Sequence, residues 1–433
     1  MTSGRTAKRR MVRRRSSAER LLSLVALLTG TEPPVRVRAW DGSEAGSPGA
    51  PLLIVHSRSA VRRLLHQRGE LGLARAYVAG ELDVEGDLYD ALARLADTGR
   101  AIGRNPRLTP SRAAQVLRDA VALGALGPAP APPAEEVLLS GVRHSRLRDR
   151  AAITHHYDVG NDFYQLVLGP SMVYSCAYFV DDEDSLAAAQ AAKLDLVCRK
   201  LGLRAGMRVL DVGCGWGSFA LHAAREYGVE VVGITLSEQQ VRLASQRGAE
   251  QGLSDRVEFR LQDWRELDDG PFDAISSIGM AEHVGEQRFG EYTAALRDLL
   301  RPGGRLLNHQ INRAPGDLVT SRTFIDAYVF PDGALLPLST VVTRLEDSGL
   351  EVRDVQNLRE HYVRTLRGWV ANLDANWDEC VALTSPGRAR VWRLYMTASA
   401  LGFARGWLRV NQTLVVRPHG DGASGVPPVR ADW

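Results

Sequence analysis

The chain contains 433 residues, of which 45% are hydrophobic and 24% are charged, and its formal net charge is only +3. This length exceeds what one hydrophobic core usually supports, so we expect two or three domains in a soluble globular protein. The sequence has four cysteines, none in a paired CxxC spacing, at Cys176, Cys198, Cys214 and Cys380. This pattern argues against a zinc site or a disulfide framework and favours a reducing compartment, with the cytoplasm as the default. We expect no bound metal and no nucleic-acid partner.

The first twenty residues form a basic arm in which the only acidic residue is Glu19. The basic residues of this arm are Arg5, Lys8, Arg9, Arg10, Arg13, Arg14, Arg15 and Arg20. Such an arm is usually a solvated tail, and its functional interpretation is attraction to an anionic membrane surface. The apolar run LLSLVALLTG after it is too short to cross a bilayer. A signal peptide is the alternative, but no small-residue cleavage site is evident, so we favour an amphipathic helix in a protein bound peripherally to the inner face of the membrane.

A proline-rich stretch divides the chain in two. Residues 127–135 read GPAPAPPAE, and because proline fixes φ and removes a hydrogen-bond donor, we interpret residues 127–145 as a semi-rigid linker. Before it, helical apolar spacing is interrupted by glycines, which predicts a small α+β accessory domain over residues 1–126 that docks on the membrane. No catalytic spacing is recognisable in that part of the chain.

After the linker, strand and helix patterns alternate, which is typical of a parallel, doubly wound α/β sheet with helices on both faces. We place this catalytic domain at residues 146–417, and a helix within it between an N-cap at Ser185 and a stop at Gly202. The Gly- and Pro-rich residues 418–433 are expected to be a disordered tail. The expected strands are MRVLDVG at 207–213, VEVVGI at 229–234, VEFRLQ at 257–262, FDAISSI at 272–278, GRLLNHQI at 304–311 and LRVNQTLVV at 408–416.

The first of these strands runs into a glycine-rich turn, VLDVGCGWGSF. Gly213, Gly215 and Gly217 allow a ligand to approach the backbone and the N-terminal amides of the following helix. A dinucleotide-binding turn has the spacing GxGxxG, but Ser218 stands where its third glycine is expected. The GxGxG spacing, preceded by the acidic Asp211, favours S-adenosylmethionine (SAM), whose cationic amino acid end needs a carboxylate or backbone carbonyls.

The ends of the next two strands supply further candidates for a cofactor site. The second strand lacks the acidic residue that usually meets the ribose, and it is followed by Ser237 and Gln240 at capping-box spacing. A helix start and a ribose contact are equally good interpretations of these two residues. The third strand ends in Asp263, whose carboxylate suits the adenine amino group, and Trp264, whose ring suits either stacking on adenine or packing in the core.

Six segments in order carry a resemblance to a known family: HHYDVGNDFYQLVLGPSMVYSCAYF, VLDVGCGWGSFALHAA, GITLSEQQ, SIGMAEHVG, RPGGRLLNHQI and FPDG. Together they resemble the cyclopropane-fatty-acyl-phospholipid synthases and the related mycolic acid cyclopropane synthases. The likeness extends from about Asp149 to Arg417. The earlier segment GELGLARAYVAGELDVEGDL looks like the accessory region of the phospholipid-acting members.

The resemblance implies a class I methyltransferase sheet with inserted helices over a lipid channel. It implies SAM as cosubstrate and an unsaturated acyl chain of a membrane phospholipid as substrate; a homodimer is left open. The SAM contacts that carry over are Tyr174, Ser175, Gly213, Gly215, Thr235, Leu236, Ser237, Gln240 and Trp264.

The resemblance further implies that a bicarbonate ion serves as the catalytic base. The residues that would hold it are Cys176, Glu282, His309, the backbone of Ile311 and Tyr362, all present in this chain. Cys176 lies in the apolar segment MVYSCAYF, where a cysteine is usually a packing residue, and the resemblance makes its thiol a hydrogen-bond donor to the bicarbonate. One departure is Ser399, where many members have cysteine.

The implied chemistry needs no nucleophile on the protein. The π electrons of a cis alkene attack the sulfonium methyl of SAM, the positive charge passes to the former double bond, and loss of one proton from the new methyl closes the cyclopropane ring. The site must exclude water and tolerate the cation, for which the aromatic faces of Tyr174, Tyr178 and Phe179 are candidates. Because Glu282 would lie beside a second anion, a proton must be shared between them.

Other interpretations stay open. The same cation can instead give a methyl or methylene branch, depending on where it loses its proton. An amine methyltransferase is disfavoured by the bicarbonate ligands, and a nicotinamide oxidoreductase is disfavoured by Ser218. A non-catalytic membrane-binding protein would suit the basic arm but would not need the bicarbonate ligands.

Overall fold

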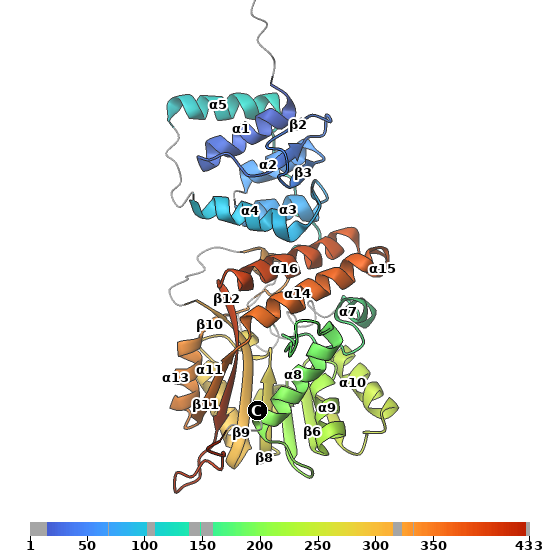
Figure 1. The fold of residues 1–433 in the computed structure, drawn as a ribbon, viewed down its shortest axis with the longest axis vertical. Coiled ribbons are helices and arrows are strands. Elements are labelled where there is room, and N and C mark those ends of the chain that lie inside the picture. The colour runs from blue at the N-terminus through green and yellow to red at the C-terminus, as the bar shows by residue number, and fades with distance from the viewer. Residues whose placement is uncertain are drawn as a thin grey trace, which may run out of the picture. The chain divides into compact units, whose positions relative to one another are not determined.

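The computed structural model describes residues 15–67, 69–101, 109–137, 148, 159–314, 323–331 and 333–429. Most of the basic arm, the first part of the HHYDVG motif and residues 138–145 of the predicted linker lie outside these residues. The chain divides into two compact units, Met1–Pro133 and Ala134–Trp433, and the division falls in the proline-rich stretch. The predicted domain limits themselves stay a prediction. Each unit is described separately below (Figure 1).

The first unit combines helices with a small mixed sheet. The strand order is β2-β1-β3-β4, in which β1 pairs parallel with β3 and the other pairs are antiparallel. The described elements are α1 Ser17–Thr29, β1 Arg36–Arg38, β2 Glu44–Ala45, β3 Leu52–Val55, α2 Arg58–His66, α3 Glu70–Val78, β4 Leu82–Glu85, α4 Leu88–Ala101 and α5 Pro110–Ala122.

Helix α1 confirms the helix expected after the basic arm. Ser16 accepts a hydrogen bond from the Glu19 N–H, and the Glu19 carboxylate accepts one from the Ser16 N–H, which forms a capping box. The helix ends at Gly30, which adopts a left-handed conformation with φ 84°. One face, including Leu21 and Leu24, is buried in the core of this unit. Within the described ranges, no helix is long and apolar enough to cross a membrane.

The second unit is a layered α/β domain. Its described elements are α7 Asn161–Leu168, α8 Leu186–Leu201, β5 Arg208–Val212, α9 Ser218–Tyr227, β6 Glu230–Thr235, α10 Glu238–Glu250, β7 Val257–Leu261, η1 Trp264–Glu266, β8 Phe272–Ile278, η2 Ala281–His283, α11 Phe289–Leu299, β9 Leu300–Arg313, α12 Phe324–Tyr328, β10 Leu336–Pro337, α13 Leu338–Asp347, β11 Glu351–Asn357, α14 Arg359–Ala375, α15 Trp377–Leu383, α16 Pro386–Ala404 and β12 Leu408–Val416.

The strand order of the main sheet is β11-β12-β9-β8-β5-β6-β7, with β10 pairing on β9. All six expected strands are present, and neighbours from β9 to β7 in this order are parallel. The expected parallel sheet is present from β9 to β7, and it is extended by β12, which runs antiparallel to both β9 and β11 and whose direction the sequence did not predict. Strand β11 was not expected from the sequence, since its charged residues and incomplete burial are those of an edge strand.

Helices cover both faces of this sheet, as the doubly wound interpretation predicted. Leu194 of α8 and Phe219 of α9 pack on one face, and Tyr292 of α11 and Leu345 of α13 pack on the other. Helices α14, α15 and α16 connect β11 to β12 at the carboxyl ends of the parallel strands (Figure 1). A ligand site at these ends is therefore roofed by inserted helices.

Helix α8 begins and ends where the sequence predicted. The Ser185 hydroxyl accepts a hydrogen bond from the Ala188 N–H at 3.2 Å, and Gly202 ends the helix with φ 66°. The helix carries its buried face over the sheet, next to the segment that contains Ser175 and Cys176. Side chains on this face of α8 therefore reach the segment that lines the candidate active site.

Candidate active site

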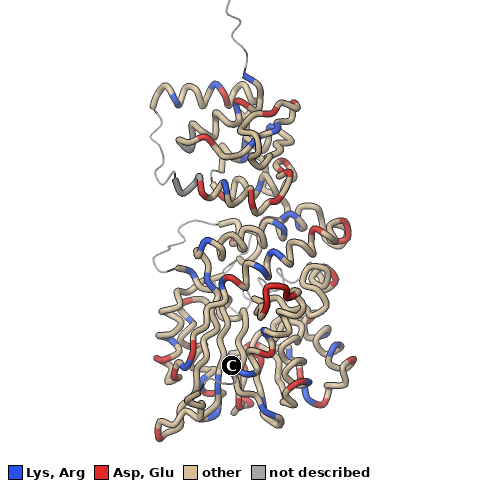
Figure 2. Tube along the Cα trace, viewed as in Figure 1, with Lys and Arg blue, Asp and Glu red and all other residues tan. Residues whose placement is uncertain are grey.

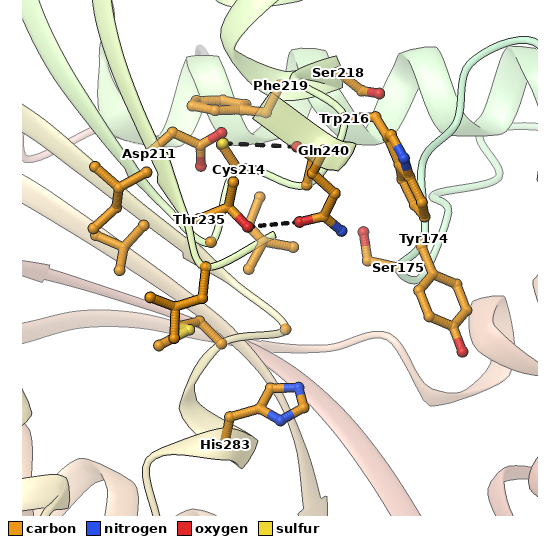
Figure 3. A pocket seen from close by; sticks show the side chains of 18 of the residues that line it. Tyr174, Ser175, Asp211, Cys214, Trp216, Ser218, Phe219, Thr235, Gln240 and His283 are labelled. Atoms are coloured by element: carbon orange, nitrogen blue, oxygen red, sulfur yellow. Dashed lines mark hydrogen bonds between the residues drawn. The ribbon is translucent and has the colours of Figure 1, made fainter. Parts of the chain in front are cut away.

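A pocket opens at the carboxyl ends of β5 and β6, between the glycine-rich turn and the segment before α8 (Figure 3). Of the twelve residues predicted for the cofactor, ten line this pocket: Tyr174, Ser175, Asp211, Gly213, Gly215, Thr235, Leu236, Gln240, Asp263 and Trp264. Segments far apart in the chain are thus brought together as the resemblance implied.

The other two predicted residues, Gly217 and Ser237, have roles in the local fold. Gly217 precedes α9 with φ 79°, and a Cβ there would lie 2.6 Å from the ring of Phe259. The Ser237 hydroxyl accepts a hydrogen bond from the Gln240 N–H at 3.3 Å, so it caps α10. Of the two interpretations of Ser237, the helix start is the one the structure shows.

The glycine-rich turn presents open backbone to the pocket at Gly215. Its φ is 54°, and a Cβ at this position would meet no atom within 4 Å. Behind it, the N–H groups of Gly213 and Cys214 both donate to the Ile234 carbonyl, at 2.9 and 3.0 Å. The turn is therefore fixed to β6 while its outer side stays accessible to a ligand.

Asp211 lies buried at the inner end of the pocket. One carboxylate oxygen, Oδ1, accepts a hydrogen bond from Ser276, and the other, Oδ2, has no hydrogen-bond partner in the described part of the chain. Burial raises the pKa of this carboxyl to about 6. At the carboxyl end of β6, the Thr235 hydroxyl donates to Gln240 Oε1 at 2.6 Å (Figure 3).

Trp264 packs in the core and also lines the pocket, and the contacts of Asp263 and Trp264 with adenine stay a prediction. Trp264 is buried edge-to-face against Tyr292, with ring centroids 5.1 Å apart, and it also lines the pocket. The Asp263 carboxylate accepts a hydrogen bond from the Arg265 N–H at 2.9 Å and pairs with the Arg265 guanidinium at 3.0 Å. The Asp263 carboxylate is therefore already fixed in position by Arg265 where it lines the pocket.

The residues predicted to hold a base lie around the paired strands β9 and β12. The Ile311 N–H donates to Glu282 Oε1 at 2.7 Å. Ile311 is opposite Val410, whose carbonyl accepts from the Leu358 N–H at 2.9 Å. The Leu358 carbonyl in turn accepts from the Cys176 thiol at 3.5 Å. One continuous set of contacts thus connects Cys176 to Glu282.

His309 and Tyr362 complete this group. The Tyr362 N–H donates to the Leu358 carbonyl at 3.1 Å, so its side chain leaves α14 one turn after Leu358. His309 precedes Ile311 by two residues and therefore lies on the same face of β9. Directly opposite His309 on β12 is Gln412, and both side chains are buried.

Burial shifts the pKa values of three members of this group toward their neutral forms. It raises the pKa of Glu282 to about 7, and it raises the pKa of the Cys176 thiol far above its ordinary value. Burial, together with the charges of Lys193 and Lys200, lowers the pKa of His309 to about 3. Within the described residues, Glu282 Oε2 and both ring nitrogens of His309 have no hydrogen-bond partner.

The aromatic side chains proposed to face a cation are placed differently from one another. Tyr174 lies beside the pocket with its ring 5.4 Å from that of Trp369. Tyr178 and Phe179 instead contact His361, and the Arg364 guanidinium lies 3.9 Å above the Phe179 ring. One face of the Phe179 ring is therefore occupied by a protein cation, and a role of Phe179 toward a carbocation stays a prediction.

The sequence interpretation did not identify two buried polar residues near these groups, Lys193 and Gln412. Lys193 lines the pocket, and Gln412 has no partner for either amide atom in the described ranges. A signal was present for Lys193, because it lies four residues after Ala189 and four before Val197 on the buried face of α8. A charged residue on such a face invites a functional explanation.

The strand order, the glycine-rich turn after β5 and the pocket at the carboxyl ends of the strands define a class I SAM-dependent methyltransferase fold. Within this class, the family described as mycolic acid cyclopropane synthetase has a model that matches residues 144–413. The chain belongs to this family, whose SAM-dependent members include cyclopropane synthases and fatty acid methyltransferases.

Three relatives illustrate the range of similarity. A protein of Mycobacterium tuberculosis named probable fatty acid methyltransferase Rv3720 is 40% identical over 95% of this chain and 98% of its own length. The cyclopropane-fatty-acyl-phospholipid synthase of Escherichia coli is 40% identical over 57% of this chain and 63% of its own length. The structure of mycolic acid cyclopropane synthase CmaA1 complexed with SAH and CTAB is 37% identical, with a TM-score of 0.59, covering 61% of this chain and 97% of that one.

Proposed function

We propose that the protein transfers the methylene group of SAM across a cis double bond in an unsaturated acyl chain of a membrane phospholipid, which forms a cyclopropane fatty acid. The observation that carries the proposal is the buried group of Cys176, Glu282, His309, Ile311 and Tyr362 beside the cofactor pocket. Cys176 directly follows Ser175 of the pocket lining, and Glu282 directly precedes His283, which also lines it.

The residues present fit a bicarbonate ion. The Cys176 thiol, the Tyr362 hydroxyl and a neutral His309 are hydrogen-bond donors, and unpartnered atoms of Glu282 and His309 lie within the group. A bound bicarbonate would supply a proton acceptor beside Glu282, because His309 is held neutral with a low pKa. Two contacts must change for this ion to bind, because the Ile311 N–H now donates to Glu282 and the Cys176 thiol donates to the Leu358 carbonyl.

The protein's own part in the reaction is to position the alkene, exclude water and move one proton. Tyr174 lines the pocket, and the rings of Tyr164, Trp369 and Trp392 pack around it, so this aromatic side is where we place the reacting double bond. Glu282, with a pKa of about 7, can carry the shared proton that keeps two anions from lying side by side. The developing carbocation then meets π faces and no side-chain nucleophile.

A second candidate is a fatty acid methyltransferase that gives a methyl or methylene branch. It is favoured by the relative that matches 95% of this chain, N-terminal unit included, and is named a probable fatty acid methyltransferase. Both candidates share the cofactor pocket and the carbocation. Loss of a proton from the new methyl with ring closure gives the cyclopropane, a hydride shift before that loss gives a methylene branch, and loss of a proton from a neighbouring chain carbon gives a methyl branch on an alkene.

We further propose that the protein works at an anionic membrane surface, with the basic arm and the first unit as the docking part. A phospholipid acyl chain is reached at a bilayer, and a polybasic segment is attracted to anionic lipid. This proposal leaves a homodimer open, and the mass of the protein in solution measures it.

The test is to incubate the purified protein with SAM and vesicles of cis-unsaturated phospholipid, and to analyse the fatty acid methyl esters by mass spectrometry and proton NMR. The proposed function predicts an added CH₂ and the high-field resonances of a cyclopropane ring. An added CH₂ with vinylidene protons would establish the branch candidate, and unchanged acyl chains would exclude both.

A further inference from the structure

The cofactor pocket contains a buried cation that the proposed reaction does not use. Lys193 of α8 lines the pocket and is only 1% exposed. Its Nζ donates to the Ser175 hydroxyl at 2.9 Å. In the part of the chain that the structure describes, Lys193 forms no ion pair with a carboxylate.

An ammonium group has three hydrogen-bond donors, so two donors of Lys193 are left for a ligand. Burial lowers the pKa of Lys193 to about 8, while the nearby Cys176 and Asp211 act in the opposite direction. The side chain is therefore mostly protonated at neutral pH. Because an unpaired buried charge is unfavourable, an anionic ligand at this position is strongly preferred.

The pocket also contains an unpaired acceptor near this cation. Asp211 Oδ2 has no hydrogen-bond partner within the described ranges, and the charges of Asp211 and Lys193 influence each other's pKa. The pocket thus presents one cationic and one acidic group, both buried and both incompletely satisfied. A zwitterionic ligand end matches this pair.

We infer that Lys193 binds the carboxylate of the amino acid end of SAM, while Asp211 faces its ammonium group. The inference rests on the proposed function in that SAM is taken as the cofactor. A second side chain of α8 contacts the same residue of the pocket lining. Gln190, three residues before Lys193, donates to the Ser175 carbonyl at 3.0 Å. The two side chains together fix Ser175, whose hydroxyl reaches into the pocket (Figure 3).

The alternative anion for Lys193 is a bicarbonate ion held near His309. Its charge does reach that site, since it contributes to lowering the pKa of His309. The geometry favours the SAM carboxylate, because Lys193 and Asp211 line the cofactor pocket and Glu282 and His309 do not.

The experiment compares SAM with 5′-methylthioadenosine, which keeps the adenosine and the sulfur atom but lacks the carboxylate, the ammonium group and the sulfonium charge. S-adenosylhomocysteine, which carries the amino acid end on the same neutral sulfur, is measured beside them and should lose affinity as SAM does. Their affinities are measured by calorimetry, without lipid, for the wild type and for Lys193→Met, which keeps the length of the side chain and removes its charge. We expect the SAM affinity to fall about tenfold to hundredfold, as for a lost charge-assisted hydrogen bond, and the methylthioadenosine affinity to stay within about twofold.

Lys200→Met is the matched control. Lys200 is a second buried lysine on α8, it pairs with Asp354 at 3.1 Å, and it does not line the pocket. This variant should bind SAM like the wild type, even if its melting temperature is lower. Lys193→Arg, which keeps the charge, should recover part of the lost SAM affinity.

Unchanged SAM binding by Lys193→Met would overturn the inference, and so would an equal loss for both ligands, which indicates a damaged pocket. Unchanged SAM binding with an altered carbonate dependence of turnover would assign Lys193 to the base instead. A wild type that does not bind SAM would contradict the proposed function, whereas a wild type that binds it while Lys193→Met binds equally well contradicts only this inference.

Discussion

Glu282 shows how one buried side chain combines a structural and a chemical role. Its Oε1 accepts from the Ile311 N–H, its Oε2 is unpartnered in the described part of the chain, and burial raises its pKa to about 7. A carboxyl in this state exchanges a proton near neutral pH, which is the property an acid-base partner needs. Burial creates this property, and Glu282 is held in its buried position in η2, where the Ala334 N–H donates to its carbonyl at 2.9 Å.

The first prediction concerns turnover. Glu282→Gln should lower it by roughly 10²-fold or more and leave the SAM affinity within a few fold, because the amide keeps the acceptor for Ile311 but holds no exchangeable acid proton. Depleting carbonate should slow the wild type, and adding it back should restore the rate. Glu286→Gln, on an exposed side chain four residues away, is the control and should keep full activity. A fully active Glu282→Gln enzyme in carbonate-free buffer would leave water or another side chain as the base.

The second prediction concerns stability. Because the folded pKa of Glu282 lies above its unfolded value, the protonated form is favoured in the folded protein, and this contribution is lost as pH rises from about 4.5 to about 7. The glutamine side chain in Glu282→Gln does not titrate. The free energy of unfolding of this variant, relative to that of the wild type, should therefore increase between pH 4.5 and pH 7. Urea unfolding at pH 4.5 and pH 8 measures both. A difference between the two proteins that does not change with pH would show that Glu282 has an ordinary pKa.

At the level of elements, the sequence predicted the regular parts of the fold well. All six expected strands and the caps of α8 are present, because alternating apolar segments and cap residues act locally. The antiparallel return of β12 and the edge strand β11 were not predicted, since both depend on where the α14–α16 insertion directs the chain.

The sequence predicted some residues of the candidate site and missed others. Residues in the glycine-rich turn and at strand ends were found because motif spacing carries the signal, and ten of the twelve line one pocket. Lys193 and Gln412 were not found, because a polar residue in an otherwise apolar helix or strand shows its importance only once its burial and missing partners are known. The approach of Arg364 from α14 to the Phe179 ring was not predicted either, because no local sequence pattern reports it.

The third prediction separates two glycines of the same turn. Gly217→Ala combines a left-handed φ of 79° with a Cβ 2.6 Å from Phe259, so it should lower the free energy of unfolding by about 2–4 kcal/mol. Gly215→Ala meets no atom, so it should cost only about 1 kcal/mol but weaken SAM binding, since its methyl group enters the ligand space. Urea unfolding and calorimetry measure the two effects. Equal stability of the two variants would mean that the packing against Phe259 is not limiting.

For the molecule as a whole, charge is distributed unevenly along the chain. Basic and acidic residues are interspersed over the described part of both units (Figure 2). The excess of positive charge is concentrated in the first twenty residues, which contain eight basic residues and one acidic residue, against a net charge of +3 for the entire chain. Arg20 is already paired with the buried Asp119 at 2.7 Å, so the arm available to a membrane ends before α1.

The fourth prediction follows from that boundary. Removing residues 1–14 leaves the Ser16 cap and the Arg20–Asp119 pair intact, so the shortened protein should fold but bind anionic vesicles more weakly, at about 1 kcal/mol per basic residue near the surface. Vesicle sedimentation at low and high salt measures this, since salt screens the attraction. Neutral vesicles are the control. If the shortened and full chains sediment equally with anionic vesicles at low salt, the arm is not an anchor.

The central claim is that carbon from the sulfonium methyl of SAM enters the acyl chain as a methylene group. It is tested most directly by supplying SAM with a trideuterated methyl group to the protein on cis-unsaturated phospholipid vesicles and analysing the lipid by mass spectrometry and deuterium NMR. The proposed reaction predicts two deuterium atoms in a cyclopropane CD₂ group of the acyl chain, because the third deuterium atom is lost to the base. Deuterium found only in the head group, or a CD₃ group retained on the acyl chain, would contradict it.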